Sequence, residues 1–472
     1  MRLLSLLILF ITAPAMAQLD SRPLPIARFT SQPYVTRDAT FRVEVSAYHV
    51  SGIAGVEFIL DGTKHWVTEQ TPNPRGYYEY ALRVRPSTLA PGLHEVTATV
   101  IPNAGPALTL SGSSTDHNDI KNGYNSFFFN TGNDLVVEVG AKEEFQTVSQ
   151  AVEFHGEALT HGGTIKLRGD HVLDMPRLSN SDSRTVMTIE GNGDTIVNNF
   201  GGFVRASSDS SYQFKDIRFH CDDTSGRFFR GSRNGRLILT DCELFSTEVE
   251  GWKKQFQYLG KSVESDWALG MWLEGIDIIN IWKGTLGVHT AKHMFADRLT
   301  GDFFGSSPGG VYDATVVSMV KDYVYHQQHS DIVQYSTGEV TDNRIFADIY
   351  APKQRSQIGH LSNTELMTNM AFINWHIDAT ECERAPDVNM NPRFDNLLIH
   401  NVTLIRGSFN WVKDATHVNT RVSIRNSIQY KQTMNRFPFS SYDDIEILFT
   451  YRMNSDWGPG CTLGPIPPLD IN

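Results

Sequence analysis

Apolar and polar residues alternate along short stretches of the segment 25–112. In Thr40–Val45, the side chains of Phe41, Val43 and Val45 fall on one face, which is typical of a strand with one buried side. Similar runs follow at 56–60, 77–84 and 94–100, and Asp61–Gly62 after the first of these favours a tight hairpin turn. This spacing predicts a small β-sandwich over 25–112, followed by a polar, turn-rich linker over 113–139.

The pattern changes from about residue 140 onward. Residues 145–159 have helical spacing and would place Val148, Ala151, Val152 and Phe154 on one face. Apolar strands are expected next at 162–167 and 186–190. A short amphipathic helix followed by strands would cover the open end of a stacked structure, whose first layer otherwise exposes its core.

A unit made of an apolar strand, one Asp or Asn, and a second apolar strand recurs at intervals of about 25 residues. One wide gap fits two units, with Asn280 as the marker of the missing one. A constant period predicts one unit stacked on copies of itself, with equivalent residues about 4.8 Å apart. We therefore expect a structural ladder at a tight turn, where short polar side chains bond the backbone. Its members are Asp216, Asp241, Asp297, Asp322, Asp348, Asn374, Asn401 and Asn426.

The helix, the strand GGTIKL and the period resemble those of right-handed parallel β-helix proteins of the pectin-lyase-like superfamily. The strands before them resemble the immunoglobulin-like modules of secreted bacterial proteins, which act as spacers or carbohydrate contacts; we expect a spacer. The resemblance implies an all-β fold: a small β-sandwich, a right-handed parallel β-helix over 140–452, and a C-terminal tail over 453–472. It also implies secreted enzymes that bind acidic polysaccharides along the outer face of one sheet, often with calcium. Phage tailspikes, adhesins and non-catalytic binders share the fold, and the motifs of classical pectate lyases and polygalacturonases are absent.

Residues 1–17 combine a short basic start, an apolar run and small residues at the expected cleavage positions, as in a secretory signal peptide. The chain is thus expected to be exported to the periplasm, the cell surface or the exterior, with no membrane span. The 41 Lys and Arg against 53 Asp and Glu argue against a nucleic-acid binder. Cys221 and Cys242 are offset along neighbouring strands by too much for a disulfide.

Neighbouring coils bring the candidate chemistry together. Aligning Ile358 under Ile332 is expected to place Arg355 beside His329, Gln357 beside Asp331, and His360 beside Gln334; the preceding coil adds Asp302 beside Asp331. If Ile332 points into the core, strand alternation directs His329, Asp331 and Val333 outward and Gln334 inward, unless the strand ends there.

These residue types suit the cleavage of an acidic polysaccharide. His329 would transfer protons, Asp302 and Asp331 would act as acid and base or hold Ca²⁺, and Arg355 would clamp the substrate anion. Substrate-binding candidates are Gln334, Gln357, His360, Tyr350 and His376. The first hypothesis is a polysaccharide lyase acting by β-elimination on an anionic polysaccharide. The alternatives are a glycoside hydrolase using the aspartate pair, and a non-catalytic glycan-binding or cell-surface protein in which the same residues only bind or form a polar stack.

Overall fold

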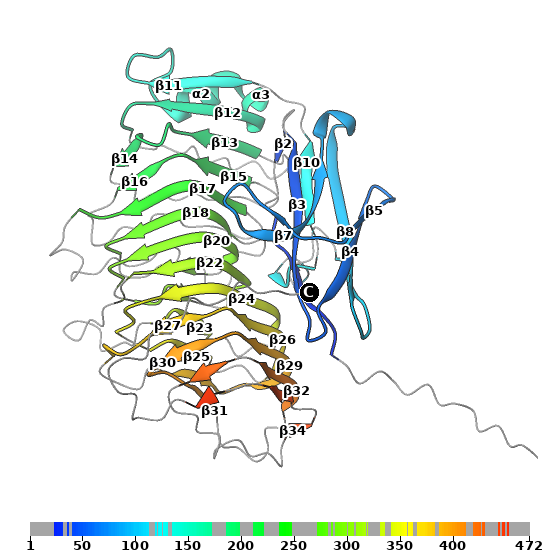
Figure 1. The fold of residues 1–472 in the computed structure, drawn as a ribbon. Coiled ribbons are helices and arrows are strands. Elements are labelled where there is room, and N and C mark those ends of the chain that lie inside the picture. The colour runs from blue at the N-terminus through cyan, green and yellow to red at the C-terminus, as the bar shows by residue number, and fades with distance from the viewer. Residues whose placement is uncertain are drawn as a thin grey trace, which may run out of the picture.

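A computed structural model shows two β domains side by side (Figure 1). The predicted signal peptide, the C-terminal tail and His329 lie outside the residues that it describes. The structure describes residues 23–31, 35–36, 40–112, 119, 121–124, 126–130, 135–171, 186–198, 211–220, 236–247, 271–281, 285–286, 288–299, 301–305, 308–317, 319, 331–335, 341–355, 357–361, 366–382, 387–411, 419–425, 427–429, 442–443, 446–448 and 451–452.

The first domain is a β-sandwich, as predicted. One sheet has the order β1 (Ile26–Phe29), β3 (Phe41–Tyr48), β7 (Tyr78–Val84) and β6 (Thr71–Pro72). The other runs β2 (Val35–Thr36), β10 (Ser126–Asn130), β8 (Gly92–Pro102), β4 (Ile53–Leu60) and β5 (Thr63–Val67), with β9 (Leu108–Leu110) also on β8; a 3-10 turn, η1 (Pro86–Thr88), precedes β8. Apolar side chains of both sheets, among them Val45, Phe58 and Val100, form a closed core.

Two local predictions in this domain can be compared with the structure. Asp61 and Gly62 join β4 to β5 with φ angles of 49° and 79°, the left-handed pair that a tight hairpin requires. The segment 113–139 is more than a linker: β10 pairs with β8 in the sandwich, and the second domain starts at β11 (Val136–Gly140). Its polar composition hid β10, because only Phe127 to Phe129 mark that strand in the sequence.

The second domain is a parallel β-helix. In the described residues its main sheet has 20 strands and a second sheet has six (Figure 1). The main sheet runs β11, β12 (His161–Arg168), β13 (Val186–Glu190), β14 (Ile196–Asn198), β15 (Ser211–Lys215), β16 (Arg218–His220), β17 (Arg236–Phe245), β18 (Met271–Ile279), β20 (Val288–Asp297), β22 (Gly310–Val316), β24 (Thr341–Ala351), β26 (Leu366–Ile373), β27 (His376–Asp378), β29 (Arg393–His400), β30 (Thr403–Ile405), β32 (Asn419–Arg425), β33 (Ile428–Gln429), β34 (Tyr442–Asp443), β35 (Glu446–Leu448) and β36 (Tyr451–Arg452). The second sheet runs β19 (Thr285–Leu286), β21 (Phe304–Gly305), β23 (Val333–Tyr335), β25 (Gly359–Leu361), β28 (Val388–Met390) and β31 (Phe409–Trp411).

Two short helices, α2 (Val148–His155) and α3 (Glu157–Thr160), cover the first coil, as expected of a cap (Figure 1). Thr147 begins α2 with a capping box in which its side chain and that of Gln150 each accept a backbone N–H of the other residue. Val148, Ala151 and Val152 are buried as predicted. Phe154, which is predicted to share that face, is 70% exposed, because at 3.6 residues per turn its side chain points well away from those of Val148 and Val152.

A row of sharp corners runs along the main sheet. At each corner one residue has a left-handed φ between 53° and 66°, and the strand registers stack these residues on one another. Asn374 Nδ2 donates to Asp348 Oδ1 at 2.8 Å, and Asn401 Nδ2 donates to Asn374 Oδ1 at 2.7 Å. We call this the corner row: Asp216, Asp241, Gly275, His293, Asp313, Asp348, Asn374 and Asn401.

The predicted ladder is therefore confirmed at Asp216, Asp241, Asp348, Asn374 and Asn401 and wrong in the middle, and Asn426 lies outside the described residues. The corners there are Gly275, His293 and Asp313, whereas Asn280 and Asp297 lie past the corner and Asp322 lies outside the described residues. Loops of unequal length separate these coils, so a fixed period drifts off the corner. Gly and His also fill the left-handed position, which a search for Asp and Asn alone does not detect.

The sandwich packs against the β-helix. Its β1–β3–β7–β6 sheet lies along the side of the β-helix (Figure 1). Arg28 Nη1 donates to the carbonyl of Asn343 at 2.6 Å, and Arg425 Nη1 donates to that of Val50 at 2.6 Å. The sandwich covers the outward side chains that precede the corner row, which we call the pre-corner face: Ile238, Trp272, Lys292, Tyr312, Ile345, Ala347, Ala371, Ile373 and Leu398.

Two further expectations concern the described part of the chain. No helix within it is long and apolar enough to cross a membrane. Cys242 is a free, buried thiol, in agreement with the expected absence of a Cys221–Cys242 bond, and Cys382 is also free and buried.

Candidate functional site

The structure brings Asp302 and Asp331 together but buries them. The register pairs Phe304 with Val333, so the two aspartates lie in adjacent coils, and the amide of Asp331 donates to Asp302 Oδ1 at 3.2 Å. The side-by-side placement matches the sequence prediction. Their exposure does not, because Asp302 is 3% exposed and Asp331 is 0% exposed. A polymer outside the β-helix therefore meets neither carboxylate directly.

The predicted directions of Val333 and Gln334 are wrong. Val333 and Tyr335 pack in the core, and Gln334 points outward from β23. Ile332 also packs in the core but lies in a bend before the strand, so strand alternation cannot be counted from it. The predicted neighbour relation holds, because Gln334 pairs with His360 in β25.

A polar row follows on the outside of the six-stranded sheet. Gln334, His360, Asn389 and Asn410 occupy equivalent positions in β23, β25, β28 and β31. Asn389 Nδ2 lies 3.2 Å from His360 Nδ1, and Asn410 Nδ2 donates to Asn389 Oδ1 at 3.2 Å. These side chains satisfy one another, which is the arrangement of a structural ladder.

Arg355 and Gln357 lie on the turn between the two sheets. Arg355 is half exposed and donates through Nε to Glu381 Oε2 of the next coil at 2.7 Å. Gln357 Nε2 donates to the carbonyl of Gly359 at 3.1 Å, so it holds the turn rather than reaching outward. The guanidinium predicted to clamp an anion is thus accessible, but it already has a carboxylate partner.

Tyr350 and His376 form a stacked pair of predicted residues on the outside of the main sheet. They occupy paired positions in β24 and β27, each two residues past the corner row, and their rings stack with centroids 5.6 Å apart at 25°. Tyr350 is 47% exposed. Burial lowers the pKa of His376 below its ordinary value, although the nearby Asp378 opposes this shift. No hydrogen-bond partner of His376 Nδ1 is found in the described part of the chain.

This pair belongs to a longer outer surface that sequence reasoning missed. We call it the post-corner face: the outward side chains that follow the corner row, namely Arg218, His220, Glu243, Phe245, Asp277, Phe295, Thr315, Tyr350, His376, Asp378, Thr403 and Ile405. The signal in the sequence is positional, since these residues stand two or four places after a corner while the core residues stand between them.

Aromatic and basic side chains meet at a second place on the post-corner face. His220 stacks on Phe245 with centroids 4.9 Å apart at 28°, and the guanidinium of Arg218 lies 5.0 Å from the same ring centroid. Arg218 also forms an ion pair with Glu243 of the next coil. Two stacked His–aromatic pairs therefore lie along one strip of the β-helix, each with an arginine–glutamate pair in nearby coils.

The described residues do not assemble a full set of metal ligands. No group of three or more His, Cys, Asp or Glu side chains among them is placed to hold a metal ion. Ca²⁺ takes six to eight oxygen ligands, and Asp302 and Asp331 supply two carboxylates, of which one already accepts an amide. No step below is routed through a metal.

No protein-family model matches the chain, and neither the curated proteins nor the solved structures include one that matches it. The fold is therefore described from its own strand registers, and its function is argued from the chemistry of its surfaces.

Proposed function

We propose that this protein is an exported, carbohydrate-active β-helix protein of the pectin-lyase-like type that binds an acidic polysaccharide along the post-corner face. The observation that carries the proposal is the stacking of the exposed Tyr350 on the half-buried His376 on that face. Of the two faces beside the corner row, the sandwich covers the pre-corner face, whereas Tyr350 on the post-corner face is 47% exposed.

The shape of the post-corner face suits an extended chain. Equivalent residues of successive coils are about 4.8 Å apart, so the face is a straight strip of regularly repeated side chains. Phe245, Phe295 and Tyr350 place rings along it at intervals of two coils or more. An aromatic ring offers a flat apolar surface with a polar edge, which matches the apolar face and hydroxyl rim of a sugar ring.

The charges on and beside this face favour an anionic sugar over a neutral one. Arg218 and Arg355 present planar forks that fit a carboxylate or sulfate. Each fork is already turned toward a glutamate of the next coil, so a bound anion would share the guanidinium rather than find it unoccupied. Binding is therefore expected to weaken steeply as salt rises.

A specific observation also favours β-elimination at the Tyr350–His376 pair. The lowered pKa of His376 keeps its imidazole neutral at pH 7, the form that accepts a proton. In this mechanism His376 takes the proton next to the uronate carboxylate, the bond to the leaving oxygen breaks, and the Tyr350 hydroxyl protonates that oxygen. The predicted proton-transfer residue His329 stays a second candidate, whereas the burial of Asp302 and Asp331 argues against the hydrolase alternative.

The test uses the full mature chain with a panel of uronate-containing, sulfated and neutral polysaccharides. Binding is measured by affinity electrophoresis, cleavage by the ultraviolet absorbance of the unsaturated uronate, and hydrolysis by new reducing ends. Tyr350→Ala is compared with Tyr78→Ala, which removes a tyrosine of similar exposure (58%) from the sandwich. Weaker binding in Tyr350→Ala alone supports the post-corner face, and equal binding in both variants overturns it.

The same assay separates the two functions. Absorbance that rises with wild type and is lost in His376→Gln establishes β-elimination at this pair. Absorbance that survives in His376→Gln and is lost in His329→Ala moves the catalytic step to His329. Binding without either product identifies a glycan-binding protein, and reducing ends without absorbance identify hydrolysis.

A further inference from the structure

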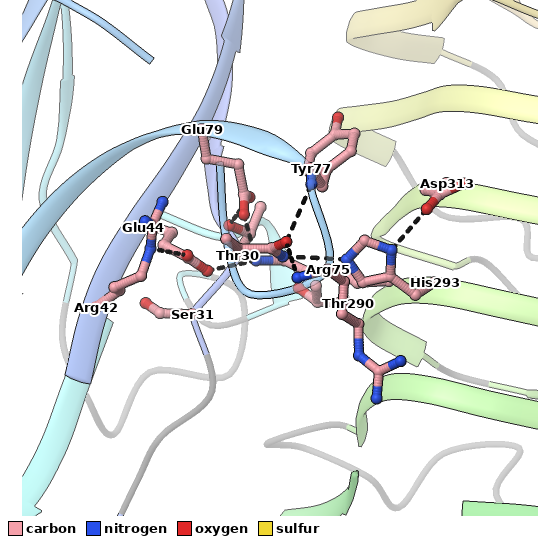
Figure 2. A network of polar contacts seen from close by, with 12 residues as sticks. Thr30, Ser31, Arg42, Glu44, Arg75, Tyr77, Glu79, Thr290, His293 and Asp313 are labelled. Carbon is pink, nitrogen blue, oxygen red and sulfur yellow. Dashed lines mark hydrogen bonds and ion pairs between the residues drawn. The ribbon is translucent and has the colours of Figure 1, made fainter. Parts of the chain in front are cut away.

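A buried ionic cluster joins the two domains. Glu44 and Glu79 come from adjacent strands of the sandwich and point toward the β-helix (Figure 2). Lys292 of β20 donates through Nζ to Glu44 Oε2 and to Glu79 Oε2, both at 2.6 Å. Lys292 is 2% exposed, and the two carboxylate side chains are 9% and 0% exposed. We call these three residues the interface triad.

Polar neighbours saturate the interface triad on the sandwich side. Arg42 Nε donates to Glu44 Oε1 at 2.6 Å, and the Thr30 hydroxyl is hydrogen-bonded to Glu79 Oε1. Arg42 is itself held by the carbonyls of Thr71 and Pro72, at 2.8 and 2.7 Å. Among the described residues, Glu44 thus has two cationic partners, Lys292 and Arg42, whereas Glu79 has one cation, Lys292, and the Thr30 hydroxyl.

The charge balance is uneven around Glu79. Both carboxylates share the ammonium of Lys292, but the second cation, Arg42, contacts Glu44 and not Glu79, so Glu79 at 0% exposure has the weaker compensation for a buried charge. A proton on Glu79 removes the less compensated of the two buried charges. A protonated Glu79 can donate from Oε1 to the Thr30 hydroxyl while Oε2 still accepts from Lys292, so every contact is kept.

We infer that the interface triad holds one proton on Glu79 at neutral pH, and that loss of this proton loosens the sandwich from the β-helix. The inference is independent of the proposed glycan binding. It makes the docking of the two domains a proton-linked equilibrium.

The surroundings of Glu79 and Glu44 shift the pKa values of the two carboxyls in opposite directions. Burial and the neighbouring charge of Glu44 raise the pKa of Glu79 from 4.5 to about 8, against the opposing effect of Lys292. Burial by itself raises the pKa of Glu44, but Lys292 and Arg42 outweigh it and lower that pKa. The titratable and charged groups around the triad are Arg42, Tyr77, Glu274 and Tyr312.

The direction in which docking changes with pH follows from the number of protons bound in the docked and undocked states. Between pH 4.5 and about 8 the docked state binds one proton more than a state in which Glu79 is solvated. Docking therefore weakens as pH rises through this window, by up to tenfold per pH unit, and changes no further above it. Below pH 4.5 docking weakens again, because Glu44 must then be protonated against its lowered pKa.

The experiment places a reporter thiol under the sandwich. Ala371 is 0% exposed and lies beneath Ile26 and Tyr48, so Ala371→Cys reacts with a thiol reagent only after undocking. Labelling at residue 371 is located by mass spectrometry and timed in the Ala371→Cys chain and in Ala371→Cys with Glu79→Gln. Because both carry the same thiol, the ratio of their rates at each pH cancels the intrinsic pH dependence of the reagent.

The ratio is the labelling rate of the Ala371→Cys chain divided by that of the chain that also carries Glu79→Gln. We expect this ratio to rise by up to tenfold per pH unit between about pH 4.5 and 8 and to stay constant at higher pH. A ratio that stays constant over this range overturns the inference. Glu57→Gln serves as the matched control, because Glu57 pairs with the exposed Lys64 on the far sheet of the sandwich, and it should leave the labelling rate of the Ala371→Cys chain unchanged at every pH.

A second measurement covers the case in which Glu79→Gln does not fold. Infrared spectroscopy of the wild-type chain should show a protonated carboxyl band at pH 7 that disappears through about pH 8. Asp348, whose pKa burial raises to about 6, is mostly ionised at pH 7 and does not account for that band. Absence of the band at pH 7 also overturns the inference.

Discussion

Replacing Lys292 with methionine should destabilise the folded chain by about 3–5 kcal/mol at pH 7, because it removes the buried ammonium to which the ionised Glu44 and the protonated Glu79 are both hydrogen-bonded. Methionine keeps the length and the apolar stem of lysine, so packing changes little. At 2.6 Å and an effective dielectric constant near 20, the contact of Lys292 with the ionised Glu44 is worth on the order of 6 kcal/mol before desolvation is counted. The desolvation of the ions offsets much of this, which leaves the smaller net figure.

The assay is denaturation of the full chain followed by circular dichroism, for the single variant and for Lys292→Met combined with Glu44→Gln and Glu79→Gln. The triple variant has no buried charge left in the triad and should recover most of the loss. Lys64→Met removes the lysine of an exposed pair and should cost at most about 1 kcal/mol. A Lys292→Met cost no greater than that of Lys64→Met, or a triple variant as unstable as the single one, would refute the reasoning.

Three further outcomes follow from the corner row and the core. Asn374→Ala should cost about 2–4 kcal/mol, because alanine is strained at φ 53° and two side-chain hydrogen bonds are lost; Asn374→Gly should cost less, and equal costs on denaturation would contradict the strain argument. Asp348→Asn should stabilise the chain by about 1–3 kcal/mol at pH 7 and by nothing near pH 3.8. Burial raises the pKa of Asp348 from 3.8 to about 6, so the stability of the wild-type chain falls as pH rises from 3.8 to 6. A difference in melting temperature that does not depend on pH would count against this. Trp375→Ala should cost about 3–5 kcal/mol and Trp375→Phe less, because Trp375 is 0% exposed and its indole donates to the carbonyl of Phe346 at 2.9 Å; urea midpoints of the two variants decide.

The architecture could be predicted because each coil of the β-helix repeats the same pattern of residue types in the sequence. The corner needs a residue that tolerates a left-handed φ between two apolar strands, and Asp348, Asn374 and Asn401 satisfy that need at nearly equal spacing. Where the loops change length, so that the interval between corners is 34 residues before Gly275 and 18 before His293, the period fails while the requirement for a left-handed residue persists. A search for any left-handed-tolerant residue between alternating strands would have found these corners as well.

The site was harder to predict because exposure depends on the exact start of a strand. The register of Asp302 with Asp331 and of Gln334 with His360 followed from counting residues between coils. Which side chains face outward depended on the bend at Ile332, and counting along the strand predicted exposed aspartates where Asp302 and Asp331 are both buried. Tyr350 and His376 stand two places past a corner, where alternation is fixed by the corner itself, and they are the pair that the structure leaves accessible.

The docking of the domains left no signal that sequence patterns alone could reveal. The polar positions of β3, including Glu44 and Ser46, alternate with core residues in the way of a strand with one face in water. They are buried against the β-helix instead. A strand whose polar face contacts water and a strand whose polar face contacts another polar surface have the same sequence pattern.

The contact between Val50 and Arg425 joins residues 375 positions apart. During synthesis at about 5–20 residues per second, Asn130 at the end of the sandwich would emerge roughly 15–60 seconds before Arg425. Throughout that interval the polar side of the β1–β3–β7–β6 sheet lacks its contacts with the β-helix. Each new coil adds a further part of the surface that this sheet will contact. The β-helix surface that contacts the sandwich is thus complete only near the end of synthesis. A truncated product would therefore have a complete sandwich beside an incomplete β-helix.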